Sequence, residues 1–189
     1  MDEADRQRDP SARAQEYLAV AKRAALFQKT VLKSAELERL RCIALRASGA
    51  RDQAVTSCTQ ATQRPLHSLQ PWSAWLELAR TLAETSDDEE TQTALLEAYQ
   101  RMATAPAQLR ADTAQSIALQ YGRIEAVQEM AEMLVLSVRD GLSLHTVACD
   151  PEWQHVYKTK KTQPSIDQVF REYAPKTALL NLQRAIPCD

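Results

Sequence analysis

The histidines and cysteines are the side chains of this sequence with the greatest potential for chemistry. His145, Cys149 and His155 follow the spacing H-x3-C-x5-H, and imidazole nitrogen and thiolate sulfur are ligands that Zn²⁺ prefers. A closed zinc site needs four ligands, and no fourth candidate stands near these three. The interpretation that we favour is a partly exposed histidine-bearing helical segment that holds no metal.

Cys42 and Cys58 are the candidates for a cysteine nucleophile. A reactive thiol needs a base or a positive charge beside it, whereas both residues fall on apolar helix faces, where packing as buried thiols is the expectation. The four cysteines, which include Cys149 and Cys188, lack CxxC spacing, and a chain of 189 residues can fold without disulfides. The sequence therefore favours a cytoplasmic, reducing environment.

Other catalytic motifs are missing from the sequence. Its three glycines are isolated, so neither a phosphate-binding loop nor a dinucleotide-binding loop can form, and the sequences G-x-S-x-G and H-E-x-x-H do not occur. The acidic run Asp87–Glu90 fits a solvated helix start, because the positive end of the helix dipole stabilises carboxylates and Ser86 with Glu89 fits a capping box. We expect a protein that is not an enzyme and uses no cofactor.

The charge balance restricts the class of partner. The chain has 23 Lys and Arg against 25 Asp and Glu, so it has no overall positive field for phosphates and nucleic-acid binding is disfavoured. The local cluster Lys158, Lys160 and Lys161 fits a solvated loop better than a site for RNA or an acidic partner. No apolar run approaches the roughly 18 residues of a membrane span. We expect no membrane association.

The spacing of apolar residues predicts an all-α fold. Apolar side chains recur three and four residues apart, and no segment shows the alternation of a half-buried strand. Residues 1–10 are expected to be disordered, and a helix is expected from Ser11 to about Leu32, with Tyr17 and Ala21 on one side. The elements that follow it come in pairs.

These paired helices recur every 35–37 residues, with breaks at Gly49, Pro65, Pro106, Gly122 and Gly141. The predicted pairs are Ala35–Ala47 with Asp52–Gln63, Trp72–Glu84 with Glu89–Ala103, and Leu109–Gln120 with Ile124–Val138. A period of this length is typical of helical repeats. The alternative is an irregular helical bundle whose alanines merely permit close packing.

Residues 35–138 resemble the tetratricopeptide-repeat family in a degenerate form. In the first pair Gly49 stands at the turn and Ala54 and Ala61 lie seven apart on one helix face, opposite Cys42 and Leu45. The second pair keeps Trp75, Leu78, Ala79 and Leu82 in the pattern W-x2-L-G-x2-Y, and Leu95 and Ala98 in its second helix. The third pair keeps Ala114, Ile117, the turn Tyr121-Gly122-Arg123, Ala126, Met130 and Met133.

The resemblance implies three helix pairs over residues 35–141, stacked as a short right-handed solenoid. Capping helices over residues 142–189 would cover one end, because a stack of repeats must shield its terminal apolar faces. The N-terminal helix, residues 11–34, would cover the other end or would be the second helix of a truncated repeat. The cap is expected to start at Asp150-Pro151 and to bury Trp153, Val156 and Tyr157. Ser165 with Gln168 suggests a further capping box, and Thr177–Ala185 a last short helix.

In this family the first helices of the pairs line a concave groove that binds peptides or partner helices. The resemblance places there Arg39, Ile43, Arg46, Leu76, Arg80, Asp112 and Gln115, with Glu36, Glu77, Ala83, Ala111 and Leu119 on the same side. Arg39, Arg46 and Arg80 would form a positive stripe suited to an acidic segment, or they are ordinary surface arginines. The lysine and asparagine clamp of chaperone-tail-binding members is absent, because its positions hold Arg39, Ile43, Glu77 and Asp112.

These observations predict a non-catalytic protein–protein interaction module that acts as an adaptor or scaffold, an assembly chaperone or a regulatory domain. The first alternative is a structural subunit of a larger complex that makes contacts through its ends, which apolar surface near Trp153 and Phe170 would favour. The second alternative is an α-helical enzyme or effector, which would show a polar pocket with several converging titratable groups.

Overall fold

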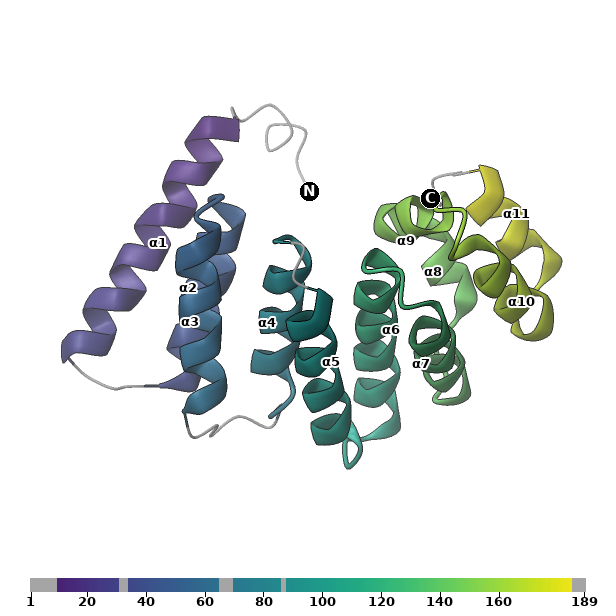
Figure 1. Cartoon of the computed structure of the whole chain (residues 1–189), viewed down its shortest axis with the longest axis horizontal. Helices are drawn as coiled ribbons and strands as arrows, with labels where there is room; N and C mark the ends of the chain where they lie inside the picture. The colour runs from purple at the N-terminus through teal and green to yellow at the C-terminus, as the bar shows by residue number, and fades with distance from the viewer. Residues whose placement is uncertain (1–9, 31–33, 65–69, 86–87, 185–189) are drawn as a thin grey trace. The chain divides into compact units, whose positions relative to one another are not determined.

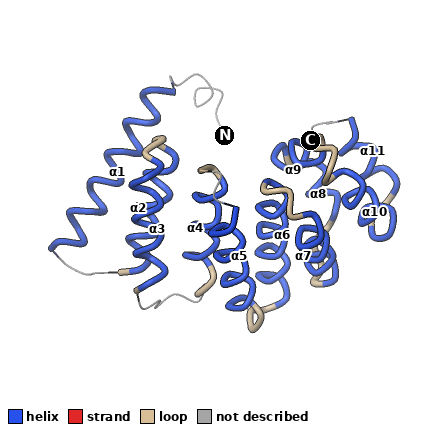
Figure 2. Tube along the Cα trace, in the orientation of Figure 1, coloured by secondary structure: helices blue, strands red, loops and turns tan. Residues whose placement is uncertain are grey.

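The computed structural model describes residues 10–30, 34–64, 70–85 and 88–184. Every regular element in these ranges is a helix, and none of the described residues lies in a strand (Figures 1 and 2). This confirms the all-α class predicted from the sequence. The chain divides into two compact units, Met1–Ala94 and Leu95–Asp189, and each is described by itself.

The first unit is built around α2. Its helices are α1 (Pro10–Thr30), α2 (Ala35–Ala47), α3 (Arg51–Gln63) and α4 (Ser73–Ala83), and the start of α5 (Asp88–Met102) also belongs to it. Helix α2 packs against α1, α3 and α4, and α3 also contacts α4. The predicted pair Ala35–Ala47 and Asp52–Gln63 is thus present, with its second helix one residue longer.

Gly49 ends α2 and forms the turn to α3, as the sequence predicts. Gly49 has a φ of 82°, a left-handed conformation that favours glycine. The N–H of Ala50 donates to the carbonyl of Leu45 at 2.9 Å and the N–H of Gly49 to that of Arg46 at 3.0 Å, which is the hydrogen-bond pattern of a Schellman cap. Ala54 and Ala61 are fully buried, so the predicted packing face is confirmed.

The packing of this pair corrects the prediction of buried free thiols. Cys42 and Cys58 face each other as expected, but their sulfurs are joined in a disulfide, with the two Cα atoms 5.2 Å apart. Small alanine side chains bring α2 and α3 close enough for this bond, whose Cα spacing is usually 4.4–6.8 Å. Cys149 is also disulfide-bonded, and no described cysteine is free.

The second unit holds six complete helices in the described residues. They are α6 (Ala107–Arg123), α7 (Val127–Arg139), α8 (Leu144–Cys149), α9 (Pro151–Tyr157), α10 (Gln163–Tyr173) and α11 (Lys176–Arg184). Helix α6 packs against α7 and α9, α7 also contacts α10, and α11 contacts α8, α9 and α10. Ile117, Met130, Trp153 and Phe170 are almost completely buried and supply much of the core.

The turn between α6 and α7 differs from the prediction. Gly122 was expected at the break, but α6 continues to Arg123, and the residue with left-handed backbone is Glu125, with a φ of 57°. The N–H of Ala126 donates to the carbonyl of Tyr121 at 2.9 Å, so the cap has the same geometry as the one at Gly49. The pairing was predicted correctly, but the residue that makes the turn was not.

Gly122 has a packing role instead. A Cβ atom at this position would lie 2.6 Å from Val156 Cγ1 and 3.0 Å from Met130 Sδ. Valine is stiff at its χ1 angle and cannot easily move away. The missing side chain therefore lets α9 and α7 approach α6 closely.

We expect Gly122→Ala to lower the free energy of unfolding by up to about 2 kcal/mol. Overpacking a filled core costs about 1–3 kcal/mol, which outweighs the gain in helix propensity of about 1 kcal/mol from glycine to alanine. Urea denaturation of the variant and the wild type measures the difference. The direction of the change tests the packing role of Gly122. If no side chain obstructed this position, alanine would stabilise the protein, because it favours the helix more than glycine does.

The C-terminal helices confirm the predicted start at Asp150. Asp150 ends α8 and caps α9, and its Oδ1 accepts from the N–H of Glu152 at 2.8 Å. Trp153, Val156 and Tyr157 are buried, as predicted. No residue separates the two helices other than this shared cap.

The predicted capping box at Ser165 is wrong. Helix α10 begins at Gln163 with Thr162 as its N-cap, so Ser165 lies inside the first turn. Pro164 fits the first helical turn, where its missing N–H costs nothing, and the Thr162 hydroxyl donates to the carbonyl of Val156 at 2.6 Å. The last helix is Lys176–Arg184, one residue earlier than predicted. The predicted disorder of residues 1–10 and the Ser86 capping box lie outside the described residues, apart from Pro10, which begins α1.

Candidate protein-interaction surfaces

The three predicted groove arginines of the first unit lie on the adjacent helices α2 and α4. Arg46 Nη2 donates to Glu77 Oε2 at 3.0 Å, and Arg80 Nη1 donates to Glu77 Oε1 at 2.8 Å. The Glu77 side chain is only 8% exposed, so both ion pairs are largely shielded from water. Glu77 therefore links the two helices and fixes the positions of Arg46 and Arg80.

Arg39 has its own carboxylate partner on α2. Its Nε and Nη2 donate to the two oxygens of Glu36 at 3.0 and 2.7 Å, the bidentate geometry that arginine and carboxylate prefer. This hydrogen bonding raises the pKa of Arg39, helped by the charge of Glu77, and lowers the pKa of Glu36. Both side chains remain charged in the ordinary pH range.

The predicted positive stripe is therefore an Arg–Glu network. Arg46 also approaches Glu84, with 3.6 Å between Nη1 and Oε1, so three arginines face the three carboxylates of Glu36, Glu77 and Glu84. The net charge of the network is zero. The sequence placed Glu36 and Glu77 on this side, but their pairing with the arginines was not predicted.

The remaining predicted site residues differ in accessibility. Ile43 is half-buried beside Arg39 and Arg46 on α2, whereas Leu76 on α4 is buried and offers little surface to a partner. Asp112 and Gln115 belong to α6 of the second unit, where Asp112 is exposed and Gln115 half-buried. The structure thus brings together the predicted residues of the first unit and leaves Leu76 in the interior.

A second charged cluster, which the sequence did not reveal, lies between α2 and α3. Glu38 is 1% exposed. Its carboxylate receives a hydrogen bond from Ser57 Oγ at 2.8 Å and forms an ion pair with Arg64 Nη2 at 2.9 Å. Arg41 Nη1 lies 3.6 Å from Oε2 of the same Glu38 carboxylate. Glu38 precedes Cys42 by four residues, so both lie on the same apolar face of α2. A charged residue on that face was the sequence signal that could have indicated a buried ion pair.

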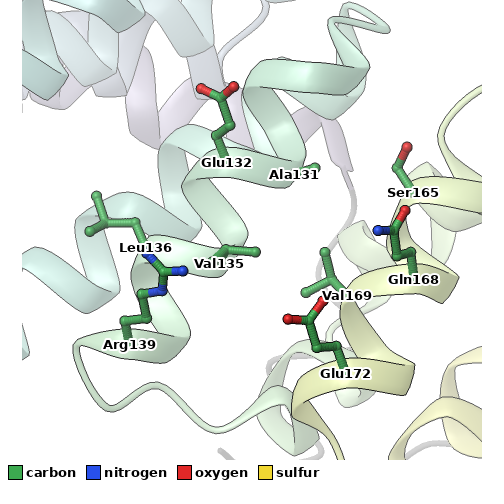
Figure 3. A pocket seen from close by; sticks show the side chains of 9 residues that line it. All are labelled: Ala131, Glu132, Val135, Leu136, Arg139, Ser165, Gln168, Val169 and Glu172. Carbon is green, nitrogen blue, oxygen red and sulfur yellow. The ribbon is translucent and has the colours of Figure 1, made fainter.

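A groove of about 410 Å³ lies between α7 and α10 in the second unit (Figure 3). Helix α7 contributes Ala131, Glu132, Val135, Leu136 and Arg139, and α10 contributes Ser165, Gln168, Val169 and Glu172. Val135 and Val169 extend into the space between the two helices, with the charged side chains of Glu132 and Glu172 toward opposite ends (Figure 3). No sequence motif marks this groove, because it depends on how two helices far apart in the chain pack.

The histidine and cysteine pattern of the sequence does not supply a ligand set. Cys149 is disulfide-bonded and has no thiolate to offer, and its Sγ lies 3.8 Å from His145 Nε2. Within the described ranges, no three His, Cys, Asp or Glu side chains converge as they would around a metal ion. Lys161 pairs with Glu125, which raises the pKa of Lys161, while Lys158 and Lys160 are exposed.

Comparison with known proteins adds no relative. No protein-family model, curated protein or solved structure matches this chain. The tetratricopeptide resemblance therefore stays a prediction from the sequence pattern. No described helix has both the length and the apolar character needed to cross a membrane.

Proposed function

We propose that this chain is a non-catalytic protein–protein interaction module, an adaptor, assembly chaperone or regulatory domain built as a degenerate tetratricopeptide-like, right-handed solenoid with capping helices. Two features support the repeat architecture. Helix α2 packs beside α4, as first helices of successive pairs do in such arrays. The α2–α3 and α6–α7 turns also have the same capping hydrogen bonds, although one is made by Gly49 and the other by Glu125.

The α2–α4 face is the proposed binding surface for a peptide or partner helix. The observation that carries this proposal is the fixed arrangement of Arg39, Arg46 and Arg80, whose side chains are 22%, 19% and 28% exposed. Their carboxylate partners hold the guanidinium groups in place but do not occupy all five donors of each. A carboxylate of a partner can bind the remaining donors with little loss of side-chain entropy.

A selection experiment tests this surface. Peptides are selected from a phage-displayed random library on the full chain, synthesised, and titrated against the variant Arg39→Ala/Arg46→Ala/Arg80→Ala. We expect the variant to bind acidic selected peptides at least about tenfold more weakly, which corresponds to about 1.4 kcal/mol.

The matched control changes three arginines that also form ion pairs but lie outside this face. Arg101 pairs with Glu97, Arg123 with Glu152 and Arg171 with Asp167, and their replacement by alanine changes the net charge equally. If both triple variants bind the peptides alike, the effect is one of overall charge and the proposed surface is wrong.

A structural subunit of a larger complex is the second candidate function. Tyr17 and Val20, three residues apart on one face of α1, are 43% and 50% exposed, and neighbouring exposed apolar side chains can mark a contact between subunits. Trp153 and Phe170, which the sequence suggested for this role, are instead fully buried. The α1 residues therefore carry this alternative.

The cytoplasmic, reducing location expected from the sequence also remains a prediction. The disulfides are the observation against it, because such bonds form and persist mainly in oxidising compartments. Thiol trapping with an alkylating reagent at the moment of cell lysis decides between the two environments.

A further inference from the structure

The walls of the α7–α10 groove are two matching helical rows. On α7, Ala131, Val135 and Arg139 follow one another at intervals of four residues. On α10, Ser165, Val169 and Glu172 form the corresponding row. At a rise of 1.5 Å per residue, these rows extend over about 12 Å and about 10 Å. The groove thus has the length of about two turns of a bound helix.

Apolar side chains form the centre of the groove. Val135 is half-buried, and Val169 is only 4% exposed. Figure 3 shows Val135 and Val169 extending into the space between the two helices. A partner helix fills such a groove with neighbouring apolar side chains three and four positions apart.

The charges at the margins are unequal. Glu132 and Glu172 lie toward opposite ends of the groove, and Arg139 lies at the same end as Glu172 (Figure 3). Gln128 Nε2 donates to Glu132 Oε1 at 3.0 Å, so a basic ligand can approach the other carboxylate oxygen of this exposed side chain. Within the described part of the chain, neither Arg139 nor Glu172 forms an ion pair. Two carboxylates against one guanidinium give the groove a net charge of −1 and favour a basic ligand.

We propose that this groove binds a short amphipathic helix of a partner protein, with basic residues at positions i and i+7 and apolar residues at i+3 and i+4. Seven residues of helix extend over about 10.5 Å, which places one basic side chain near Glu132 and the other near Glu172. The two apolar residues then face Val135 and Val169. This site is separate from the α2–α4 face and goes beyond the function proposed for it.

The two ends of the groove are expected to contribute unequally. Arg139 repels a cation that approaches Glu172, whereas among the described residues that line the groove no basic side chain lies at the end near Glu132. The basic residue beside Glu132 is therefore the stronger anchor, and loss of Glu132 should weaken binding more than loss of Glu172.

Fluorescence anisotropy with designed peptides tests the proposal on the full chain. The probe is a labelled 14-residue alanine- and glutamine-based helix with lysines at i and i+7 and leucines at i+3 and i+4. One control peptide has both lysines replaced by glutamates, and a second has both lysines moved to the opposite helix face. We expect the probe to bind at least about tenfold more tightly than either control.

Protein variants locate the binding. Glu132→Gln/Glu172→Gln should reduce binding of the probe to the level of the glutamate peptide, with Glu132→Gln the more harmful single change. Glu129→Gln is the matched control, because Glu129 is exposed on the same helix but does not line the groove. Both glutamates of the groove are exposed, so the variants should keep the wild-type urea midpoint.

The proposal is overturned if no peptide binds, if the three peptides bind alike, or if Glu129→Gln has the effect of Glu132→Gln. The variant Arg39→Ala/Arg46→Ala/Arg80→Ala separates this proposal from the function proposed above, since it should bind the probe like the wild type. If that variant no longer binds the probe, the peptide binds at the α2–α4 face, and the proposal that it binds in the α7–α10 groove is wrong.

Discussion

Removal of the Cys42–Cys58 disulfide, in the variant Cys42→Ala/Cys58→Ala, is expected to lower the free energy of unfolding by about 3 kcal/mol. The bond joins residues 16 positions apart, and closing a loop of this size reduces the conformational entropy of the unfolded chain by about that amount. The bond is also buried between α2 and α3, where Thr81 Oγ1 of α4 lies 3.5 Å from Cys42 Sγ. Urea denaturation followed by tryptophan fluorescence measures the change.

The control for this prediction is the response to dithiothreitol. Cys149 is also disulfide-bonded, so the effect of reductant on the double variant reports that other bond alone, and the difference from wild type isolates Cys42–Cys58. Alkylation of the denatured, unreduced wild type gives an independent check by mass spectrometry. If both Cys42 and Cys58 become labelled, the bond is absent and the predicted stabilisation does not exist.

The second large effect is expected from Arg64→Met, which should lower the free energy of unfolding by about 3 kcal/mol. Removing one partner of a buried ion pair leaves an uncompensated charge, and such changes cost about 3–5 kcal/mol. Glu38 is the charge left behind here. It is 1% exposed and would keep the Ser57 hydroxyl as a hydrogen-bond donor and Arg41, at 3.6 Å, as a more distant ion-pair partner, so its charge would be only partly compensated. The low end of the range is expected because the Arg64 side chain is 22% exposed.

Two further variants separate this mechanism from a loss of packing. Arg41→Met should cost much less, because Arg41 lies 3.6 Å from the same carboxylate, compared with 2.9 Å for Arg64. Glu38→Leu/Arg64→Met should recover most of the lost stability, since apolar side chains often replace a buried ion pair without cost. A double variant as unstable as Arg64→Met would show that the buried charge is not the cause.

The sequence predicted the helices well because their signals are local. Gly49 and Gly141 have φ values of 82° and 105° and end α2 and α7, as expected of isolated glycines after an apolar stripe. Gly122 was misplaced because a glycine required for close packing has the same local appearance as one required for a turn. The contact with Val156 that explains Gly122 joins residues 34 positions apart, and spacing within one helix pair contains no information about it.

The candidate surfaces were predicted less completely than the fold. The family resemblance placed Arg39, Arg46 and Arg80 on one side, and the structure does group them. Their positive charge is neutralised, however, because Glu77 pairs with Arg46 and Arg80, and Glu36 pairs with Arg39. Whether an arginine is free or paired depends on side-chain geometry across two helices. The α7–α10 groove was missed for a similar reason, since Val135 and Val169 read separately as ordinary core residues of their own helices.

Asp150 is the single residue that joins α8 to α9. Because it ends α8 and caps α9 at once, the junction contains no spare residue that could absorb a change in the angle between the two helices. An inserted residue would deprive one helix of its cap, whereas most surface connections tolerate added length. The buried Trp153 lies three residues after Asp150, so its position in the core is tied to the direction of α8.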